Sequence, residues 1–388
     1  MPQLASIKDC TGCLACLDAC KHQAIQKINK YGHLFIRVEN SKCINCGICE
    51  KVCPITTFKN QNKIENIHIY GGWCKDSQIR KTSASGGAFS GCALAVLNQN
   101  GIVFGATLIN NAVKHISINS VDNLHLLQNS KYLQSNTEGI FKQVKESLNK
   151  GLFVLFSGTP CQVAALNNFL HKKYENLLTI DLICNGIPSA EAIGQFKNAH
   201  KPQNIISFRD KKYGWHSLKS QSITWVDPNN SIIKEHRNDD IFYQIFSAGL
   251  THRRICCHCP FSSIPRQADI TIADFWGIKR FKEEWQDGIS LIITNNKTGE
   301  NFIQKNNFLQ IFSSSLEECI HANPRLINGK KYHEYHPVIL FPSLKKILPN
   351  KMYNNIIRNK MPYKLFWAPY KIMTIISNNR KIKSVLQK

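Results

Sequence analysis

The sequence predicts a small cysteine-rich α+β module followed by a larger α/β domain, and three observations lead to this division. The first 58 residues hold eight of the sixteen cysteines, in two copies of one spacing. From residue 70 onward, short β-rich apolar runs alternate with helical stretches, which is typical of α/β domains. The 388-residue chain is too long for one ordinary core, and its 43% hydrophobic and 19% charged residues predict a globular protein.

The N-terminal cysteines follow the spacing C-x2-C-x2-C-x3-C twice, thirty-three residues apart. In such a run three thiolates bind one 4Fe-4S cluster, while the fourth turns away and binds its neighbour. The first cluster is therefore expected on Cys10, Cys13, Cys16 and Cys53, and the second cluster on Cys43, Cys46, Cys49 and Cys20. Two zinc sites are the alternative, but zinc usually takes its thiolates as C-x2-C pairs from separate loops. Residues 1–58 are thus predicted to form a bacterial-type ferredoxin domain with two clusters.

The other elements follow in chain order. Residues 31–36, between the two cysteine runs, predict a hairpin strand, and the polar residues 59–69 predict a linker. The larger domain begins at residue 70 and divides into an N-terminal part, 70–150, and a C-terminal part, 151–320. Its predicted strands include 101–105, 152–156 and 177–182, and its predicted helices include 88–97 and 139–148.

Several motifs at the ends of these elements are candidates for a binding site. The Ser85-Gly86-Gly87 turn precedes a helix, where backbone N–H groups can face a phosphate, although a tight strand-to-helix turn explains it as well. Cys161 and Cys184 each follow a predicted buried strand, at the edge where ligands of open α/β sheets bind. The run Cys256-Cys257-His258-Cys259 supplies a C-x2-C pair and is also compatible with zinc.

Taken in order, these motifs resemble those of the β subunits of coenzyme F420-reducing hydrogenases and formate dehydrogenases, including bacterial relatives with a fused ferredoxin domain. The resemblance covers about residues 1–300. It depends on Ser85-Gly86-Gly87, Ser130-Lys131-Tyr132, Ser157-Gly158-Thr159-Pro160-Cys161-Gln162, Cys184-Asn185-Gly186, Phe208-Arg209-Asp210-Lys211, Gly214-Trp215, Cys256 with Cys259, Asp269-Ile270-Thr271 and Asp274-Phe275-Trp276-Gly277.

The resemblance implies an FAD-binding α/β domain of the F420 hydrogenase β-subunit type, which passes electrons between iron-sulfur clusters and a hydride carrier. It implies a third 4Fe-4S cluster on Cys161, Cys184, Cys256 and Cys259. The residues expected to contact FAD are Ser85, Gly86, Gly87, Lys131, Asp274 and Trp276.

Other residues near these motifs leave alternatives open. Trp215 and Trp276 are candidates for ring stacking or for the core, and the core is favoured for Trp215. Asp274 and Arg266 are expected either to serve the site or to form a mutual salt bridge, because an unpaired buried charge is costly. The cysteines without partners by spacing, which are expected in the core, are Cys74, Cys92 and Cys319.

Two functional classes follow from the resemblance. In the first, the chain is itself an iron-sulfur flavoprotein oxidoreductase that exchanges a hydride with an organic substrate, and bacterial relatives often belong to surface polysaccharide biosynthesis. In the second, it is a non-catalytic electron-transfer subunit that docks on a partner enzyme. The expected redox donor is ferredoxin or a reduced deazaflavin or nicotinamide. The sequence singles out no catalytic residue.

The net charge of +23 is concentrated at the C-terminus, where residues 325–388 hold fourteen Lys or Arg and one acid, Glu334. Residues 321–388 predict a basic amphipathic segment that lies on an anionic membrane surface or packs as a solvated basic helix pair. An RNA contact is a further alternative, but nucleic acid is not the expected partner. Neither a signal peptide nor a spanning apolar run is visible, so a cytoplasmic location is expected, with peripheral binding to the inner face of the membrane as an option.

Overall fold

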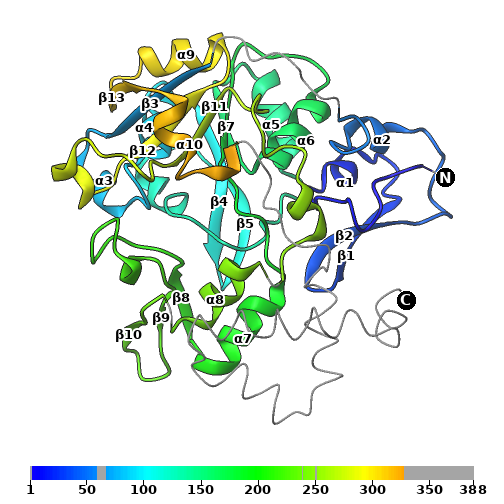
Figure 1. Cartoon of the computed structure of the whole chain (residues 1–388). Helices are drawn as coiled ribbons and strands as arrows, with labels where there is room; N and C mark the ends of the chain where they lie inside the picture. Colours follow the sequence, from blue (N-terminus) through cyan, green and yellow to red (C-terminus); the bar gives the residue numbers. More distant parts are fainter. Residues whose placement is uncertain (1, 59–66, 238, 250, 327–388) are drawn as a thin grey trace.

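The computed structural model describes residues 2–58, 67–237, 239–249 and 251–326, and a mixed eight-stranded sheet forms the centre of the larger domain (Figure 1). In spatial order the strands are β13 (Leu309–Ser314), β3 (His68–Cys74), β12 (Ser290–Thr294), β11 (Ile270–Asp274), β7 (Leu177–Leu182), β6 (Val154–Gly158), β4 (Ile102–Ile109) and β5 (Ala112–Ile118). The four strands from β11 to β4 are parallel to one another, whereas the outer strands are antiparallel to their neighbours. Because β6 and β7 are adjacent and parallel, the residues that follow them meet at one edge of the sheet.

Helices cover both faces of this sheet because its strands carry apolar side chains on both sides. Val154 of β6 packs with α5 (Ile140–Asn149) and α6 (Pro160–Leu170), whereas the next residue, Leu155, packs with α4 (Ala88–Leu97). This alternation follows from the two-residue period of a strand that is buried on both faces. The shorter helices of the domain are α3 (Ser77–Thr82), α9 (Lys297–Gln304) and α10 (Leu316–Ile320), with 3-10 turns η1 (Val121–Leu126), η4 (Lys282–Trp285) and η5 (Pro324–Leu326).

The sequence located some of these elements. The strand predicted at 101–105 corresponds to β4, which begins at Ile102 and extends to Ile109. The helix predicted over 88–97 and the strand predicted over 177–182 are confirmed. The strand predicted at 152–156 begins two residues later, at Val154, and the helix predicted at 139–148 begins at Ile140. Gly139 precedes that helix because its left-handed conformation, with φ of 79°, cannot continue a helix. The sequence predicted two parts of the larger domain, divided at residue 150. These two parts share one sheet, since β3 and β4 of the first part pair with strands of the second.

The N-terminal module contains two short helices, α1 (Ala15–Ala19) and α2 (Ile48–Val52), and a hairpin of β1 (Ile25–Lys30) and β2 (His33–Val38). The predicted hairpin strand is therefore confirmed. Its two-residue turn, Tyr31-Gly32, has positive φ at both positions, as the favoured tight hairpin turn requires. Helices of five residues are unstable alone, so tertiary packing must stabilise them.

The module docks on α5 and α6 through apolar and polar contacts. Ala15 and Val52 are fully buried in the core that these helices share with the sheet. The Asp18 carboxylate accepts hydrogen bonds from the backbone N–H groups of Gly139 at 2.7 Å and Phe141 at 3.2 Å, where α5 begins. A carboxylate is favourable at this end because the helix dipole is positive there. Asp18 therefore fixes the module to the first turn of α5.

A smaller subdomain, which the sequence did not predict, is inserted between β7 and β11. Its elements are α7 (Ala190–His200), β8 (Asn204–Ser207), η2 (Leu218–Ser220), β9 (Thr224–Val226), β10 (Ile232–Lys234) and α8 (Ile241–Ala248). The three strands form an antiparallel sheet of their own, in the order β10-β9-β8. In Figure 1 this subdomain lies at the opposite end of β4 and β5 from α9.

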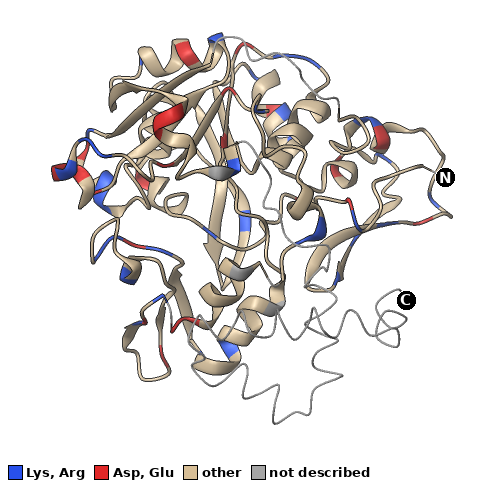
Figure 2. Cartoon of the chain, viewed as in Figure 1, with Lys and Arg blue, Asp and Glu red and all other residues tan. Residues whose placement is uncertain are grey.

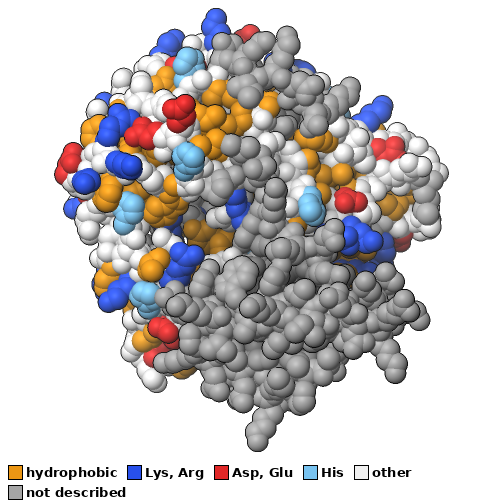
Figure 3. Space-filling view, viewed as in Figure 1, with side chains coloured by type: hydrophobic (Ala, Val, Ile, Leu, Met, Phe, Trp, Pro, Cys, Tyr) orange, Lys and Arg blue, Asp and Glu red, His pale blue; other side chains and the backbone are white. Residues whose placement is uncertain are grey.

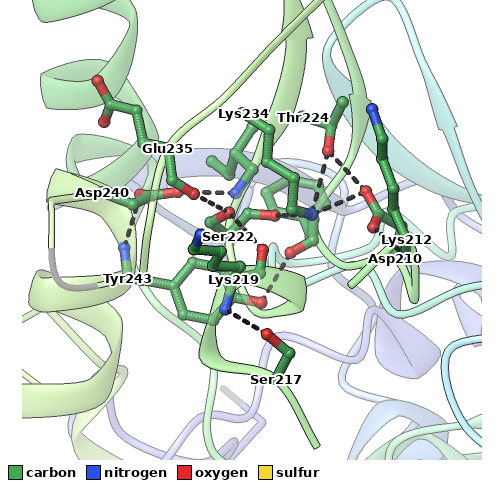
Figure 4. Close-up of polar contacts among 12 residues, drawn as sticks. Asp210, Lys212, Ser217, Lys219, Ser222, Thr224, Lys234, Glu235, Asp240 and Tyr243 are labelled. Carbon is green, nitrogen blue, oxygen red and sulfur yellow. Dashed lines mark hydrogen bonds and ion pairs between the residues drawn. The ribbon is translucent and has the colours of Figure 1, made fainter. Parts of the chain in front are cut away.

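Polar contacts join the loops and strands of this subdomain (Figure 4). The Asp210 carboxylate accepts hydrogen bonds from the Lys234 ammonium at 2.7 Å and from the Thr224 hydroxyl at 2.9 Å. Asp240 caps α8 by accepting a hydrogen bond from the backbone N–H of Tyr243 at 3.0 Å. Because Asp210 and Lys234 neutralise each other, this cluster has a structural role in joining β9 and β10 to the loop after β8.

Charges of both signs are distributed over the described part of the chain (Figure 2). On the face shown in Figure 3, hydrophobic side chains lie between charged ones over the main domain. Among the described residues, no helix is both long enough and apolar enough to cross a membrane. The predicted linker falls outside the described residues over 59–66, and its last two residues belong to β3, which begins at His68. The predicted basic segment falls outside the described residues from residue 327 onward.

Replacing Asp18 by Ala should lower the free energy of unfolding by about 1 to 3 kcal/mol, because two backbone N–H groups at the start of α5 lose their acceptor. Urea unfolding of the anaerobically purified protein, followed by circular dichroism, measures this loss. Glu146→Ala, at an exposed position of the same helix, is the matched control and should change the free energy by less than about 0.5 kcal/mol. Equal stability of the two variants would contradict the docking role of Asp18.

Candidate functional site

The structure brings the four predicted ligands of the first cluster together. Cys10 and Cys13 precede α1, Cys16 lies in it, and Cys53 follows α2. Burial, together with a smaller contribution from the nearby thiols of Cys10 and Cys53, raises the pKa of the Cys13 thiol to about 12. Such thiols become thiolates when a metal binds them. This donor set fits a 4Fe-4S cluster, with Cys53 as the fourth ligand.

The other N-terminal cysteines line one small cavity of the module, whose sulfur-bearing residues are Cys20, Cys43, Cys46 and Cys49. Cys46 is exposed, and the side chain of the neighbouring Ile44 is 61% exposed. The backbone N–H of Ala24 lies 3.3 Å from the Cys20 sulfur, as a hydrogen-bond donor. This donor set fits the second cluster, at a place that solvent reaches.

The cysteines expected to bind a third cluster also converge. Cys161 lies in the first turn of α6, Cys184 follows β7, and Cys256 and Cys259 lie in and after η3 (Arg254–His258). Cys161 and Cys184 meet because the strands before them are adjacent and parallel. Burial raises the pKa values of all four thiols, and the Cys184 thiol raises those of the other three further. Four thiols in one buried place are the donor set that a 4Fe-4S cluster needs.

Thiols of different groups also lie near one another, which gives the groups an order. The pKa of Cys16, a member of the first group, is raised by burial and by the other thiols of that group. The thiol of Cys49, a member of the second group, raises it too, so the two groups are adjacent. In the same way Cys13 raises the pKa of Cys161, so the first group adjoins the third. The three groups therefore follow one another, from the exposed second group through the first to the third.

Within the described residues, no group of three or more His, Cys, Asp or Glu side chains is placed to hold a single metal ion. A cubane has a different requirement, because each thiolate binds a different iron atom. The remaining cysteines Cys74, Cys92 and Cys319 are buried among apolar side chains, which confirms their expected place in the core.

A cavity of about 480 Å³ opens at the carboxyl ends of β6, β7 and β11. Its volume lies within the range of small-molecule and cofactor pockets, about 300 to 1,000 Å³. Cys13, Cys161 and Cys184 line its wall. The first and third cysteine groups therefore border the same space.

Five of the six residues predicted to contact FAD line this cavity, namely Ser85, Gly87, Lys131, Asp274 and Trp276. The sixth, Gly86, packs behind the wall. A Cβ atom at Gly86 would lie 2.6 Å from both the carbonyl oxygen of Gly72 and the backbone nitrogen of Ser290. The close approach of this turn to β3 and β12 therefore requires a glycine at position 86.

Two polar groups on the cavity wall lack the partners that buried groups normally have. Within the described part of the chain no carboxylate pairs with Lys131, whose ammonium donates to the carbonyl oxygens of Leu126 and Gln128. Burial lowers the pKa of Lys131 to about 7. The Oδ1 atom of Asn129 is buried, and none of the described residues donates a hydrogen bond to it. A ligand with both an anionic group and hydrogen-bond donors, as FAD has, would satisfy both residues.

Asp274 is held by two side chains. Its Oδ2 atom accepts a hydrogen bond from Arg209 Nη1 at 2.5 Å, and its Oδ1 atom accepts one from the Trp215 indole N–H at 2.6 Å. Trp215 is fully buried, which confirms the core position favoured for it, and stacks on Trp276 with ring centroids 4.7 Å apart. Trp215 therefore occupies one face of Trp276, and the guanidinium of Arg209 also lies over the ring, 5.2 Å from its centroid.

The prediction of a mutual salt bridge between Arg266 and Asp274 is wrong. Arg266 pairs with Asp181 of β7 at 3.2 Å, while Asp274 pairs with Arg209. Arg266 precedes β11 and Asp274 ends it, so the length of the strand separates them, whereas Asp181 lies on the neighbouring strand.

Sequence patterns did not single out His115, which also lines the cavity. Its Nε2 atom lies 3.0 Å from the carbonyl oxygen of Ser157, and its Nδ1 atom lies 2.7 Å from the Ser135 hydroxyl. Because a carbonyl oxygen only accepts, Nε2 carries the proton and Nδ1 accepts from the hydroxyl. Burial lowers the pKa of His115 to about 4, so the ring is neutral near pH 7. Its inward position in the alternating pattern of β5 is the only signal that the sequence held.

Comparisons with known proteins agree with this two-part organisation. Residues 9–57 match the family described as the 4Fe-4S dicluster domain, and residues 153–311 match the family described as the C terminus of the coenzyme F420 hydrogenase/dehydrogenase beta subunit. No curated protein matches the chain. One similar solved chain comes from the F420-reducing NiFe hydrogenase complex of Methanosarcina barkeri, studied by xenon derivatization. It is 13% identical, has a TM-score of 0.49, and the match covers 75% of this chain and 97% of that one. A likeness this weak carries no conclusion about function.

The stability that His115 contributes should fall as the pH decreases. Its pKa of about 4 in the folded protein lies below the ordinary value of about 6.5, so acid favours the unfolded state. Relative to His115→Gln, the wild type should lose about 2 kcal/mol between pH 7 and pH 5, measured by urea unfolding at both values. His125→Gln, at an exposed position, should keep the wild-type pH dependence. A constant difference between wild type and His115→Gln would count against this assignment.

Proposed function

Because the chain joins a 4Fe-4S dicluster domain to a region of the coenzyme F420 hydrogenase/dehydrogenase beta-subunit family, we propose that it is an iron-sulfur flavoprotein oxidoreductase. With clusters on the three cysteine groups and FAD in the 480 Å³ cavity, electrons would enter at the second group, pass the first and third groups, and reach the flavin. The hydride partner there is an organic substrate. The observation that carries this proposal is the cavity itself, whose wall combines Cys13, Cys161 and Cys184 with the unpaired cation of Lys131.

Exposure supports the second cluster as the point where electrons enter. Cys46 and Ile44 are both exposed, so a donor can approach this site closely. The cysteines of the first and third groups are buried or half-buried, and none of them is exposed. We propose a ferredoxin, or a reduced deazaflavin or nicotinamide, as the donor.

The residues of the cavity wall have distinct proposed roles. Lys131 neutralises a phosphate of FAD, and the free Oδ1 atom of Asn129 accepts a hydrogen bond from the cofactor. Asp274 orients Trp215 and Arg209, and through Trp215 it fixes the ring of Trp276. A bound flavin would exchange single electrons with a cluster and two with a hydride partner. The neutral His115 holds the Ser157 carbonyl, next to the third cysteine group.

The alternative is a non-catalytic electron-transfer subunit that docks on a partner enzyme. The exposed Ile44 beside Cys46 also suits such a partner. The two functions differ in the cavity, because a self-sufficient oxidoreductase needs FAD there and a simple electron carrier does not.

Anaerobic purification with iron, sulfide and flavin measured together should give about twelve irons and one FAD per chain, because three clusters hold four irons each. Cys161→Ser should lose about four of these irons, since the third cluster loses a ligand. Cys319→Ala is the matched control, because this buried cysteine belongs to the core and should leave the iron content unchanged. Eight irons without flavin in the wild type would reduce the protein to a two-cluster carrier.

Lys131→Met should weaken FAD binding by about 10-fold to 100-fold, the effect of losing one charge-assisted contact, while the iron content stays the same. Because the pKa of free Lys131 is about 7, the affinity of the wild type should also decrease as the pH rises from 7 to 9, and that of the variant should not. Fluorescence titration of the flavin-depleted protein with FAD measures both effects.

Lys150→Met, an exposed lysine after α5, is the control for this series and should bind FAD like the wild type. Unchanged affinity and unchanged pH dependence in Lys131→Met would remove Lys131 from the proposed FAD site.

A further inference from the structure

Arg253 is a buried cation that lies between two of the cysteine groups. Its side chain is 1% exposed. Nη1 donates to the carbonyl oxygen of Cys10 at 3.0 Å, and Nη2 donates to the carbonyl oxygen of Leu34 at 2.6 Å and to Gln134 Oε1 at 2.9 Å. The carbonyl oxygen of Arg253 itself accepts from the N–H of Cys256 at 2.9 Å. Arg253 therefore contacts the first cysteine group with its guanidinium and the third with its backbone.

No carboxylate in the described part of the chain neutralises Arg253. The other buried arginines all have one, in the pairs Arg80 with Glu284, Arg209 with Asp274, and Arg266 with Asp181. The guanidinium of Arg253 lies 4.4 Å from the ring centroid of Phe35, which attracts a cation but carries no net charge. Burying an unpaired cation is strongly unfavourable, so a negative charge must be supplied from elsewhere.

The thiolates of the two adjoining cysteine groups can supply that charge. Burial lowers the pKa of Arg253, and thiolates at Cys10, Cys256, Cys161 and Cys13 oppose the decrease. Two of these cysteines belong to the first group and two to the third. With a cluster bound, four thiolates and the core have a formal charge of about −2, which becomes about −3 on reduction.

We propose that Arg253 is an electrostatic bridge between the first and third clusters, which raises the reduction potentials of both. The proposal rests on the proposed function, because it needs the third cluster. A positive charge beside a cluster favours its reduced form, which is more negative by one charge. When one electron leaves the first cluster and enters the third, the total negative charge around Arg253 stays the same. The attraction between Arg253 and the two clusters together is therefore similar before and after the transfer, and it does not oppose the movement of the electron.

Local packing keeps the guanidinium in this position. Gly12 lies between Cys10 and Cys13, and a Cβ atom there would lie 2.5 Å from Nη2 of Arg253. Gln134 closes the other side, since its Nε2 atom donates to the carbonyl oxygen of Gly12 at 3.1 Å. A charge held this rigidly acts on both clusters without first having to reorganise.

The test compares Arg253→Met, which removes the charge at similar length, with Arg253→Lys, which keeps it. Cluster potentials are measured on the anaerobically purified full chain by redox titration followed by electron paramagnetic resonance. In Arg253→Met, the reduction potentials of the first and third clusters should each fall by at least about 59 mV. For a one-electron couple this is a tenfold weaker affinity for the electron. The remaining potential, that of the second cluster, is the internal control, because the thiols that act most strongly on Arg253 belong to the first and third groups. Arg253→Lys should keep all three near the wild-type values.

Further outcomes separate this proposal from the proposed function. In a Cys161→Ser background, which lacks the third cluster, Arg253→Met should shift one of the two remaining potentials. If the wild-type protein contained only eight irons, there would be no third cluster, and the proposed bridge would be ruled out as well. Unchanged potentials in Arg253→Met with full iron would overturn the bridge and leave the proposed function intact.

Loss of iron in Arg253→Met is also informative. Full iron and wild-type potentials in Arg253→Lys would then support the role of the charge. Equal iron loss in both variants, or equal shifts in both, would show that Arg253 acts only through the hydrogen bonds of its guanidinium and would overturn the proposal.

Discussion

The docking of the N-terminal module against α5 and α6 is the interaction on which the rest of the candidate site depends. The helices of the module have five residues each and are too short to be stable by themselves, so they depend on packing. Asp18 holds it to the start of α5, and the Thr137 hydroxyl donates to the carbonyl oxygen of Cys13 at 2.7 Å. These bonds bring Cys13 beside Cys161 and onto the cavity wall. The two parts of the chain therefore build one site together rather than standing side by side.

A second feature of the candidate site is a set of cations that lie near the cavity and the cysteine groups. Lys131 faces the cavity, Arg253 lies between two cysteine groups, and Lys211 holds the turn that carries Ser85. The ammonium of Lys211 donates to the backbone carbonyl oxygens of Arg80, Ser85 and Asp287. All three cations donate to backbone carbonyl oxygens, and Lys131 and Arg253 in addition lie beside places where anionic groups are proposed. The distribution of buried charge suits a region that collects negative charge during reduction.

The sequence could predict those parts of the site that depend on local patterns. The spacing of the eight N-terminal cysteines is such a pattern, and so is the position of Cys161 and Cys184 after apolar strands. The small subdomain was missed because strands such as β9 and β10 have three residues each, too few to show a period. Arg253 was missed because its partner Cys10 is 243 positions away, and only the folded chain brings them together. For the same reason the partner of Arg266 was assigned incorrectly, since pairing across neighbouring strands leaves no mark on sequence spacing.

The inserted subdomain leaves the main sheet after Cys184 and returns before β11 at Cys256 and Cys259, so cysteines stand at both of its ends. An inorganic centre held by these residues would close a loop of about 70 residues, and closing a loop restricts the unfolded chain. Assembly of that centre and folding of the subdomain would then favour each other thermodynamically. Changes in the length of the loop would leave its two anchoring ends where they are. A change in the length of strands β9 and β10 would therefore leave the sulfur ligands in place.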